Sequence, residues 1–146
     1  MRTRSPNRIV GTLVGAGYLL AGILGFTATT GVDFFDTEGG MLVGLFEVNP
    51  SQNVVHLLVG AALLLAALSN RTASRTVNSV AGAFSLVLGL ASLFLVGSSA
   101  NFLAVNVADN VAHFASAALL LAVGLGAEQS APASAKDPGR TTKSRP

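Results

Sequence analysis

The hydrophobic positions of this chain form four long runs, without the alternation typical of strands or the one-sided stripe typical of soluble helices. Each run, with its flanking residues, approaches the roughly 20 residues that an α-helix needs to cross the hydrocarbon core of a bilayer. The pattern therefore predicts an all-α fold, an integral membrane four-helix bundle over residues 9–127. The expected spans are about 9–28, 50–68, 78–97 and 107–127.

Polar stretches separate these runs. Residues 1–8 form the N-terminal segment. The longest connection, residues 27–49, contains an apolar segment at 41–48 that is too short to span a membrane and is expected at the interface or across the helix ends. Residues 69–79 are expected to form a short polar turn. Residues 128–146 are rich in Pro, Ser, Ala and Thr without periodicity, which predicts a disordered tail.

An internal repeat relates the second and fourth runs. Residues 48–67 align with residues 105–124 without a gap, and the agreement includes polar positions that a shared apolar composition does not explain. The matched polar pairs are Asn49/Asn106, Asn53/Asn110 and His56/His113. We infer two tandem helix pairs in the same orientation, related by a pseudo-twofold axis along the membrane normal. The second and fourth spans then occupy equivalent places, with their polar starts at similar depth.

The first polar residues of each copy have the spacing of helix caps. Asn49 is a preferred N-cap residue, and Pro50 at the first helical position lacks an N–H that would have no intrahelical partner. Gln52 occupies the third helical position, from which its side chain can reach back to the cap. In the second copy Asn106 is the expected cap and Asp109 takes the third position, where a negative charge favours the positive helix end. Starting a helix is a sufficient role for the matched pair Asn49 and Asn106.

Polar side chains continue beyond the caps. His56 lies four residues after Gln52 and His113 four residues after Asp109, so each pair shares one helix face. Both histidines lie about 10 Å of axial rise past their caps, a depth that capping does not explain. An ionisable group inside a span faces protein or a cavity and is by default a functional-site hypothesis. The candidate polar cluster is Asn53, His56, Asp109, Asn110 and His113.

Three interpretations of the histidine pair remain open. In the first, neutral His56 and His113 hydrogen-bond to Asn or Asp across the bundle and fix the register of its two halves. In the second, the histidines and Asp109 form a site for a proton or a ligand, because imidazole changes charge near neutral pH. In the third, the two histidines ligate haem or a metal between the second and fourth spans. The first is favoured, so no cofactor is predicted, with His56 and His113 the candidate ligands if a metal binds.

The charge distribution adds an orientation. Residues 9–70 and 76–135 contain neither Lys nor Arg. The basic residues lie in three short patches: Arg2, Arg4 and Arg8; Arg71 and Arg75; and Lys136, Arg140, Lys143 and Arg145. Short basic segments of membrane proteins stay in the cytoplasm, so we predict a multi-pass protein of the plasma membrane with both termini cytoplasmic. No basic stripe favours nucleic acid. The lipid bilayer is the expected partner, with a membrane-protein partner or a homo-oligomer left open.

Two features have a second interpretation. A basic start before an apolar run also fits a cleaved signal peptide over residues 1–26, although the run is long and the cleavage site weak. Small residues at i, i+4 spacing in the first and third runs, such as Gly11, Gly15, Gly82 and Gly89, let helix backbones approach closely. They favour packing within the chain over a dimerisation motif.

Composition excludes several classes of protein. With 51% hydrophobic and 11% charged residues the chain does not fit a soluble domain, and without Cys it has no disulfide or thiolate ligand. Phosphate-binding loops, nucleophile elbows and HExxH motifs are absent from the sequence, so an enzyme is not expected. The acidic residues Asp33, Asp36, Glu38 and Glu47 are interpreted as solvated loop charges, with a weak cation site as the alternative.

Two stretches resemble a known family. "LVGLFEVNPSQNVVHLLVGAALL", residues 42–64, and "SSANFLAVNVADNVAHFASAALL", residues 98–120, are similar to the signature segments of domain of unknown function 4383, and the resemblance covers residues 8–126. It implies a small four-span membrane protein of bacterial origin and no particular activity. We therefore expect a non-enzymatic structural or accessory membrane component with a paired Asn/His cluster at its extracytoplasmic end. The alternative is a haem, metal or proton-linked site at His56 and His113.

Overall fold

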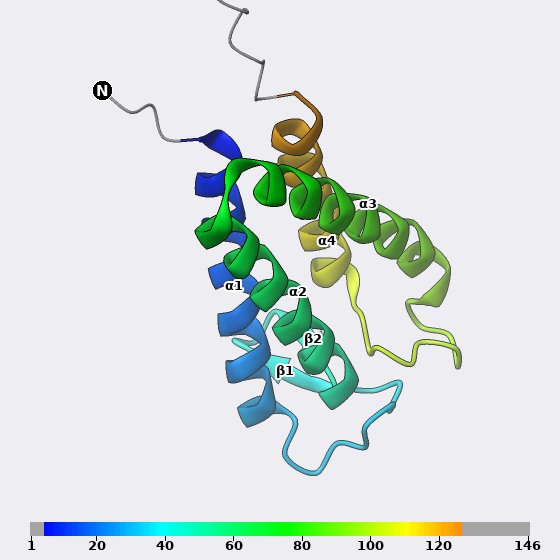
Figure 1. The fold of residues 1–146 in the computed structure, drawn as a ribbon. Coiled ribbons are helices and arrows are strands. Elements are labelled where there is room, and N and C mark those ends of the chain that lie inside the picture. The colour runs from blue at the N-terminus through cyan, green and yellow to red at the C-terminus, as the bar shows by residue number, and fades with distance from the viewer. Residues whose placement is uncertain (1–4, 127–146) are drawn as a thin grey trace, which may run out of the picture.

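The computed structural model describes residues 5–126, which form four helices and one small hairpin (Figure 1). The predicted tail and the basic residues before residue 5 and after residue 126 lie outside this part of the chain. The elements are α1 (Pro6–Ala28), β1 (Gly40–Leu42), β2 (Phe46–Val48), α2 (Pro50–Ser69), α3 (Arg71–Leu95) and α4 (Val107–Leu121), which continues as the π-helical turn η1 (Ala122–Gly126).

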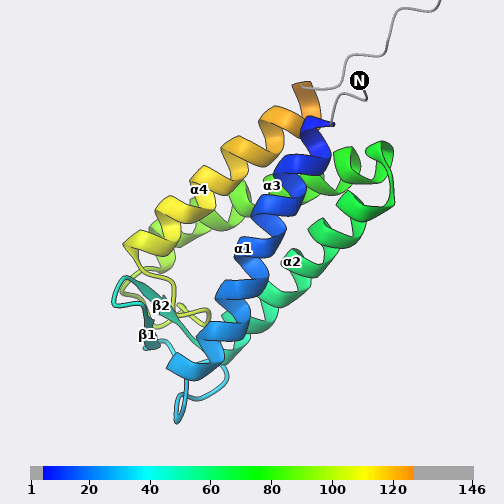
Figure 2. The ribbon, with the colours of Figure 1, turned by 90° about the vertical axis from the view of Figure 1, so that its left-hand side faces the viewer.

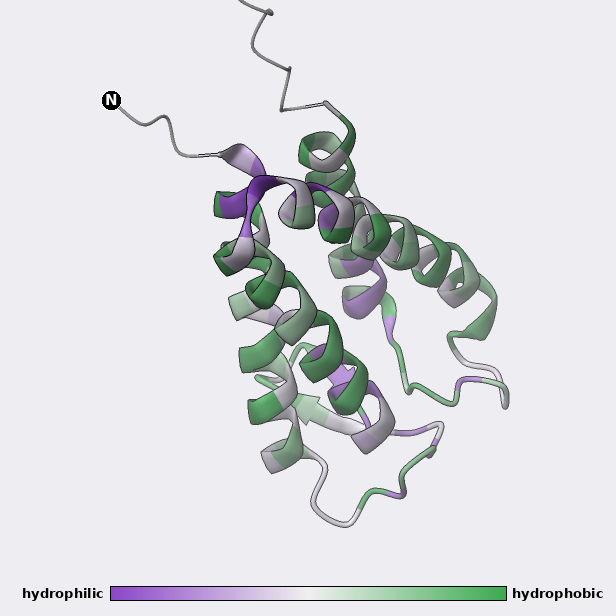
Figure 3. Cartoon of the chain, in the orientation of Figure 1, coloured by the Kyte–Doolittle hydropathy of each residue, from purple (hydrophilic) through white to green (hydrophobic). Residues whose placement is uncertain are grey.

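All four helices are long and apolar enough to cross a membrane, α4 together with η1. The predicted all-α four-helix membrane bundle is therefore confirmed, and the chain is a multi-pass membrane protein. Large apolar side chains point outward, as lipid-facing residues do; Leu13, Leu65 and Phe94 are examples. In Figure 3 most of each helix is hydrophobic (green), and polar (purple) segments are concentrated near the helix ends.

The two ends of the bundle differ. The described N-terminus, the α2–α3 turn and the end of η1 lie together at one end, which we call the termini end (Figures 1 and 2). The connections at residues 29–49 and 96–106 lie together at the other, the loop end. Helix α1 packs mainly on α2 and α3 mainly on α4, so the fold consists of the two helix pairs that the repeat indicates.

The connection between α2 and α3 is shorter than predicted. Residues 69–79 were expected to be a turn and the third span to begin at 78, whereas α3 begins at Arg71 and Asn70 alone separates the helices. Asn70 ends α2 and caps α3, its side chain accepting a hydrogen bond from Ala73 N at 2.9 Å. The apolar run marks where a helix enters lipid, and a polar helix can extend beyond that point. The prediction of a turn at 71–79 was therefore wrong.

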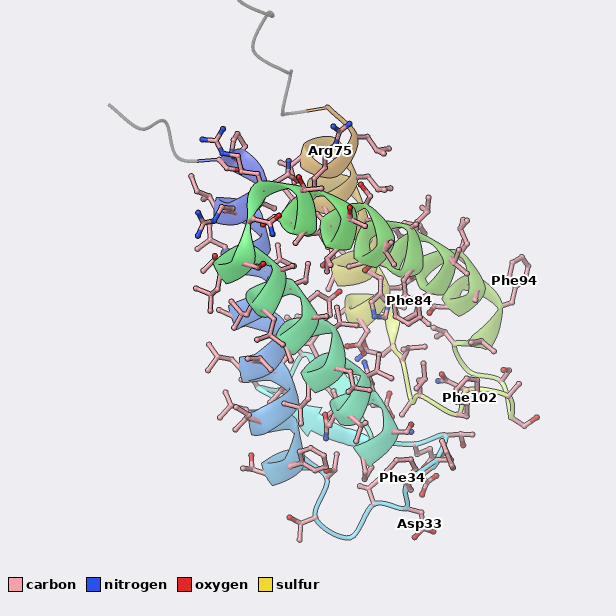
Figure 4. The ribbon with its side chains drawn as sticks, in the orientation of Figure 1. Asp33, Phe34, Arg75, Phe84, Phe94 and Phe102 are labelled. Atoms are coloured by element: carbon pink, nitrogen blue, oxygen red, sulfur yellow. The ribbon has the colours of Figure 1, made fainter. Side chains whose placement is uncertain are left out.

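Polar side chains tie the two pairs together at the termini end. Asn78 Nδ2 on α3 donates to Asn7 O and Asn7 Oδ1 on α1, both at 2.9 Å, and Asn7 Nδ2 donates to Val123 O at 2.8 Å. Arg75, also at this end (Figure 4), donates from Nε to Gly124 O at 3.0 Å. Each hydrogen bond satisfies a polar group near the membrane boundary, where an unpaired one is costly.

The short apolar segment at 41–48 forms a hairpin. Strands β1 and β2 pair antiparallel, with Gly40 opposite Val48 and Leu42 opposite Phe46. The turn has positive φ at Val43 (48°) and Gly44 (70°), as a type I′ turn requires. The hairpin contacts α1 through β1 and α4 through β2, and so crosses the loop end between these two helices (Figure 2).

Glycine sets the distance between α1 and α2. A Cβ atom built on Gly15 would lie 3.0 Å from Gly60 O, and one on Gly60 would lie 2.8 Å from Gly15 O, so the backbones meet with no room for side chains. This agrees with packing within the chain. Gly17 differs, because a Cβ atom there would meet no atom within 4 Å.

Candidate functional site

The predicted caps begin both repeat helices. Asn49 Oδ1 accepts from Gln52 N at 2.9 Å at the start of α2, and Asn106 Oδ1 accepts from Asp109 N at 3.0 Å at the start of α4. The second start is a full capping box, because Asp109 Oδ2 accepts from Asn106 N at 2.9 Å. Pro50 occupies the first turn of α2, as a residue without an N–H can.

The same caps also reach into the other half of the molecule. Asn49 Nδ2 donates to Phe102 O at 2.8 Å, across to the loop of the second repeat, and to Asp36 O at 2.8 Å. In the equivalent direction, Asn106 Nδ2 donates to Leu45 O of the hairpin at 2.9 Å. Each cap therefore fixes a carbonyl of the opposite half, and the repeat produces a reciprocal brace rather than two isolated caps. We call these cap-to-loop hydrogen bonds the cross-brace.

Gln52 and Asp109, the equivalent third helical residues, extend the cross-brace. Asp109 Oδ2 accepts from Glu47 N on β2 at 3.2 Å. The amide nitrogen of Gln52 donates to Leu103 O at 2.7 Å and Glu47 O at 3.0 Å. With the amide reversed, its nitrogen would lie 3.4 Å from Asp109 Oδ1, but its oxygen would face both carbonyl oxygens. The first orientation is favoured because it gives each carbonyl a donor.

The next polar pair lies deeper. Asn53 is fully buried, and its Nδ2 donates to Thr29 Oγ1 at 3.3 Å. Asn110 is also buried. Within the described chain, Oδ1 of both residues lacks a hydrogen-bond partner. Neither asparagine is among the residues that line the cavity described below.

The two histidines lie beside the cross-brace without belonging to it. His56 is 8% exposed and His113 4% exposed, and Nδ1 of each buried ring has no hydrogen-bond partner among residues 5–126. The expected hydrogen bonds from Asn or Asp to these Nδ1 atoms are not formed, although Oδ1 of Asn53 and of Asn110 is also without a partner among residues 5–126. At the loop end, the described side-chain hydrogen bonds between the two halves come from the starts of α2 and α4.

Both histidines border one cavity in the loop half of the bundle. The cavity has a volume of about 320 Å³ and lies between α1 and α4, beneath the hairpin. Its polar lining is His56, Asp109, His113, Tyr18 and Ser116, and its apolar lining includes Val14, Ala21, Leu42 and Phe46. The ring of Tyr18 lies 5.3 Å from that of His56, centroid to centroid, and its hydroxyl lies 3.5 Å from Ser85 Oγ. We call this space the histidine cavity.

The described residues do not form a metal centre of three or more protein ligands. Among residues 5–126 no group of three or more His, Cys, Asp or Glu is arranged to hold a metal ion. Haem ligation by His56 and His113 stays a prediction, and we derive no function through a metal.

Sequence reasoning did not single out several parts of this site. Tyr18 and Ser116 were not among the predicted site residues, and residues 41–48 were expected at the interface or across the helix ends without a role in a site. Of the loop acids, Glu47 has a structural contact, because its Oε1 accepts from Gly39 N at 2.8 Å. Asp33 lies at the loop end beside Phe34 (Figure 4) and does not reach the histidine cavity. The polar Tyr18 within an apolar run was the one available signal.

Comparison with known proteins adds a family to this geometry. The family model described as Domain of unknown function (DUF4383) matches residues 8–126, so the chain belongs to this family. No curated protein and no solved structure matches the chain.

Proposed function

We propose that this member of the DUF4383 family is a non-enzymatic binding component of the plasma membrane, and that its ligand occupies the histidine cavity. The cross-brace supplies a rigid frame at the loop end, and His56 and His113 supply polar contacts inside it. In this proposal the asparagine caps have the structural role, and the histidines bind a ligand.

The charge pattern supports an orientation for this site. Arg8, Arg71 and Arg75 lie at the termini end of the bundle. Among the described residues, the charged side chains of the loop end are all acidic. Because short basic segments are retained in the cytoplasm, the termini end faces inward and the histidine cavity lies in the extracytoplasmic half.

One observation carries the proposal, namely that the two histidines stand at equivalent positions of the repeat and border the same cavity. Their Nδ1 atoms are buried and do not face this space. A ligand in the cavity therefore contacts the rest of two imidazole rings, together with the polar side chains of Tyr18 and Ser116, at one place.

The geometry favours binding over catalysis. An activated nucleophile needs a base within hydrogen-bond reach, itself oriented by a third group. In the described structure the Asp109 Oδ2 atom is engaged by Asn106 N and Glu47 N, and no hydrogen bond connects a hydroxyl to either imidazole. A fixed frame around an apolar cavity with a few polar groups is typical of a binding site.

The test is to identify what the pure protein carries. The full chain is purified in mild detergent, and its solvent extract, absorbance spectrum and metal content are compared with those of a His56→Phe/His113→Phe variant. We expect a small molecule in the wild-type extract that is lost in the variant. Identical extracts contradict the proposal, and a Soret band or stoichiometric metal replaces it with cofactor binding.

Stability separates the binding role from a structural one. If the histidines bind a ligand, phenylalanine keeps the ring shape and removes an unpaired nitrogen, so the ligand-free variant should be at least as stable as wild type. If the histidines fix the register, the same variant should unfold at lower denaturant concentration. An Asn49→Ala variant is the matched control, because it breaks the cross-brace and leaves the cavity lining intact.

A further inference from the structure

Resting on the proposed function, we propose that the ligand of the histidine cavity is a lipid-soluble amphiphile with a small uncharged head group that carries hydroxyl or carbonyl oxygen. It enters sideways from the bilayer, through the gap between α1 and α4, and keeps its tail among the lipid chains.

The route of entry follows from the position of the cavity. Gly17, on the α1 wall, is exposed and has open space where a side chain would begin. Leu13 and Leu20 flank it at i−4 and i+3 on the same helix face and are 68% and 58% exposed. Leu119 on α4, three residues after Ser116 of the cavity wall, is 55% exposed. These side chains are lipid-facing in a spanning helix, so the mouth of the cavity opens to hydrocarbon.

The hairpin blocks the alternative route from water. Leu42, Phe46 and Val48 of the hairpin line the cavity on its loop-end side, and Val48 is completely buried. The hairpin itself is fixed, because Asp109 accepts from Glu47 N and Asn106 donates to Leu45 O. A ligand dissolved in the bilayer therefore reaches the cavity between α1 and α4. A ligand dissolved in water would first have to displace the hairpin, which Asp109 and Asn106 hold in place.

The lining has two chemical parts. His56, His113 and Asp109 stand on the α2 and α4 side, and Val14 and Ala21 on α1 form an apolar surface together with the hairpin. This division matches an amphiphile whose head reaches the histidines and whose first carbons lie along α1. The volume of about 320 Å³ lies at the lower end of the range found for small-molecule pockets, which suits a small head and the start of a chain.

The head group carries no negative charge because the cavity lining has no cation to pair with it. No Lys or Arg lines it, and residues 9–70 and 76–135 contain none, so a phosphate or carboxylate head would be desolvated without a cation and would approach Asp109. Asp109 is the charged residue of the lining, and its Oδ2 already accepts two backbone N–H groups, which favours an uncharged head over a cationic one. A hydroxyl can donate to or accept from an imidazole nitrogen, and a carbonyl oxygen accepts from one that carries hydrogen.

The chain contains its own probe for occupancy. Tyr18 is its single tyrosine, the chain has no tryptophan, and Tyr18 lines the cavity with its ring 5.3 Å from that of His56. Tyrosine emission therefore reports contact between this one site and a quencher. Bromine quenches tyrosine on contact, so a bromine atom on the carbon next to a head group reports where that head group binds.

The experiment titrates Tyr18 emission of the purified full chain, reconstituted in lipid vesicles that contain no other protein, with two matched probes. One is dodecan-1-ol brominated at carbon 2, and the other is dodecanoic acid brominated at carbon 2. We expect saturable quenching by the alcohol, and at least roughly tenfold weaker apparent affinity for the acid at neutral pH.

Gly17→Leu is the blocking variant, because its side chain starts in open space at the cavity mouth and introduces no backbone clash. Ala62→Leu is the control, since Ala62 is exposed on α2 and does not line the cavity. The alcohol should lose saturable quenching in Gly17→Leu, by roughly tenfold or more in affinity, and keep it in Ala62→Leu. Thermal unfolding of both variants checks that each is folded.

The outcomes separate the ligand class from the binding function. Equal quenching in wild type and Gly17→Leu means that the alcohol acts from bulk lipid, and overturns the proposed entry and ligand class. Preferential binding of the acid overturns the uncharged head group and leaves the binding function standing. If neither probe binds while the extract contains a molecule whose retention requires the histidines, the ligand class is wrong and the proposed function is supported.

Discussion

The cross-brace predicts that three asparagine caps of the same chain contribute unequally to stability. Asn70 caps α3 at an exposed site, and its side-chain oxygen accepts one backbone N–H. Asn106 caps α4 and donates one further hydrogen bond, to Leu45 O. Asn49 is completely buried, caps α2 and donates two, to Asp36 O and Phe102 O. Local sequence makes the three caps alike, and tertiary contacts distinguish them.

The magnitudes follow from these hydrogen bonds. Replacing an N-cap asparagine by alanine costs about 1 kcal/mol, and each net hydrogen bond contributes about 1 kcal/mol. The expected losses are about 1 kcal/mol for Asn70→Ala, about 2 for Asn106→Ala and about 3 for Asn49→Ala. For Asn49, Ser51 can still donate to Phe102 O, now at 3.0 Å, which limits the loss.

Serine variants isolate the brace from the cap, because serine caps about as well as asparagine and lacks the amide donors. Asn49→Ser should still lose about 2 kcal/mol, and Asn70→Ser should lose almost nothing. The measurement is the free energy of unfolding in mixed micelles titrated with a denaturing detergent, followed by helical circular dichroism. If Asn49→Ser is no more destabilised than Asn70→Ser, the cross-brace contributes nothing and the reasoning is refuted.

Three further predictions concern packing, charge and topology. Gly22→Ala should destabilise the protein by about 1–3 kcal/mol, because its Cβ would lie 2.9 Å from Asn53 O. Gly17→Ala should be neutral or stabilise the protein by up to about 1 kcal/mol, because its Cβ would meet no atom within 4 Å. The same unfolding assay compares the two variants. Asp109→Asn should fold with near wild-type stability, because the side-chain oxygen of the new asparagine still accepts from the backbone N–H groups of Asn106 and Glu47, and its side-chain nitrogen faces the amide oxygen of Gln52. Asp109→Ala should lose at least about 2 kcal/mol of stability, because both backbone N–H groups lose their acceptor. A cysteine introduced at Ser98 should react with a membrane-impermeant thiol reagent on intact cells, and labelling that needs permeabilised cells would reverse the proposed orientation.

The four helices and their starts were predictable because their signals are local. A long apolar run predicts a spanning helix by itself, and Asn49–Pro50 predicts a helix start from a few neighbouring residues. The start of α3 was missed because hydropathy marks the edge of the membrane, whereas Arg71–Ser79 continues as a polar helix beyond it. The hairpin at 41–48 was missed for a similar reason, since strand pairing needs the surface that α1 and α4 provide.

The candidate site was predictable only in part. The repeat indicated that His56 and His113 are equivalent, and the structure places both at one cavity. It could not indicate which polar groups would be taken up by other hydrogen bonds, because Asn49 and Gln52 each have a partner, Phe102 and Leu103, more than fifty positions away in the sequence. The functional role of the cluster stays a prediction, to be decided by what the protein binds.

The duplication also explains why a nearly symmetric frame can produce an asymmetric site. The repeated residues Asn49 and Asn106 each need the opposite loop, so the cross-brace works in both directions. The two loops differ, however, because residues 29–49 contain the hairpin and residues 96–106 form no strand. The hairpin lies between α1 and α4, and there it covers a space that both histidines border. Symmetry therefore brings the two histidines to one cavity, and we propose that the unequal loops leave it covered on the water side and open toward the lipid.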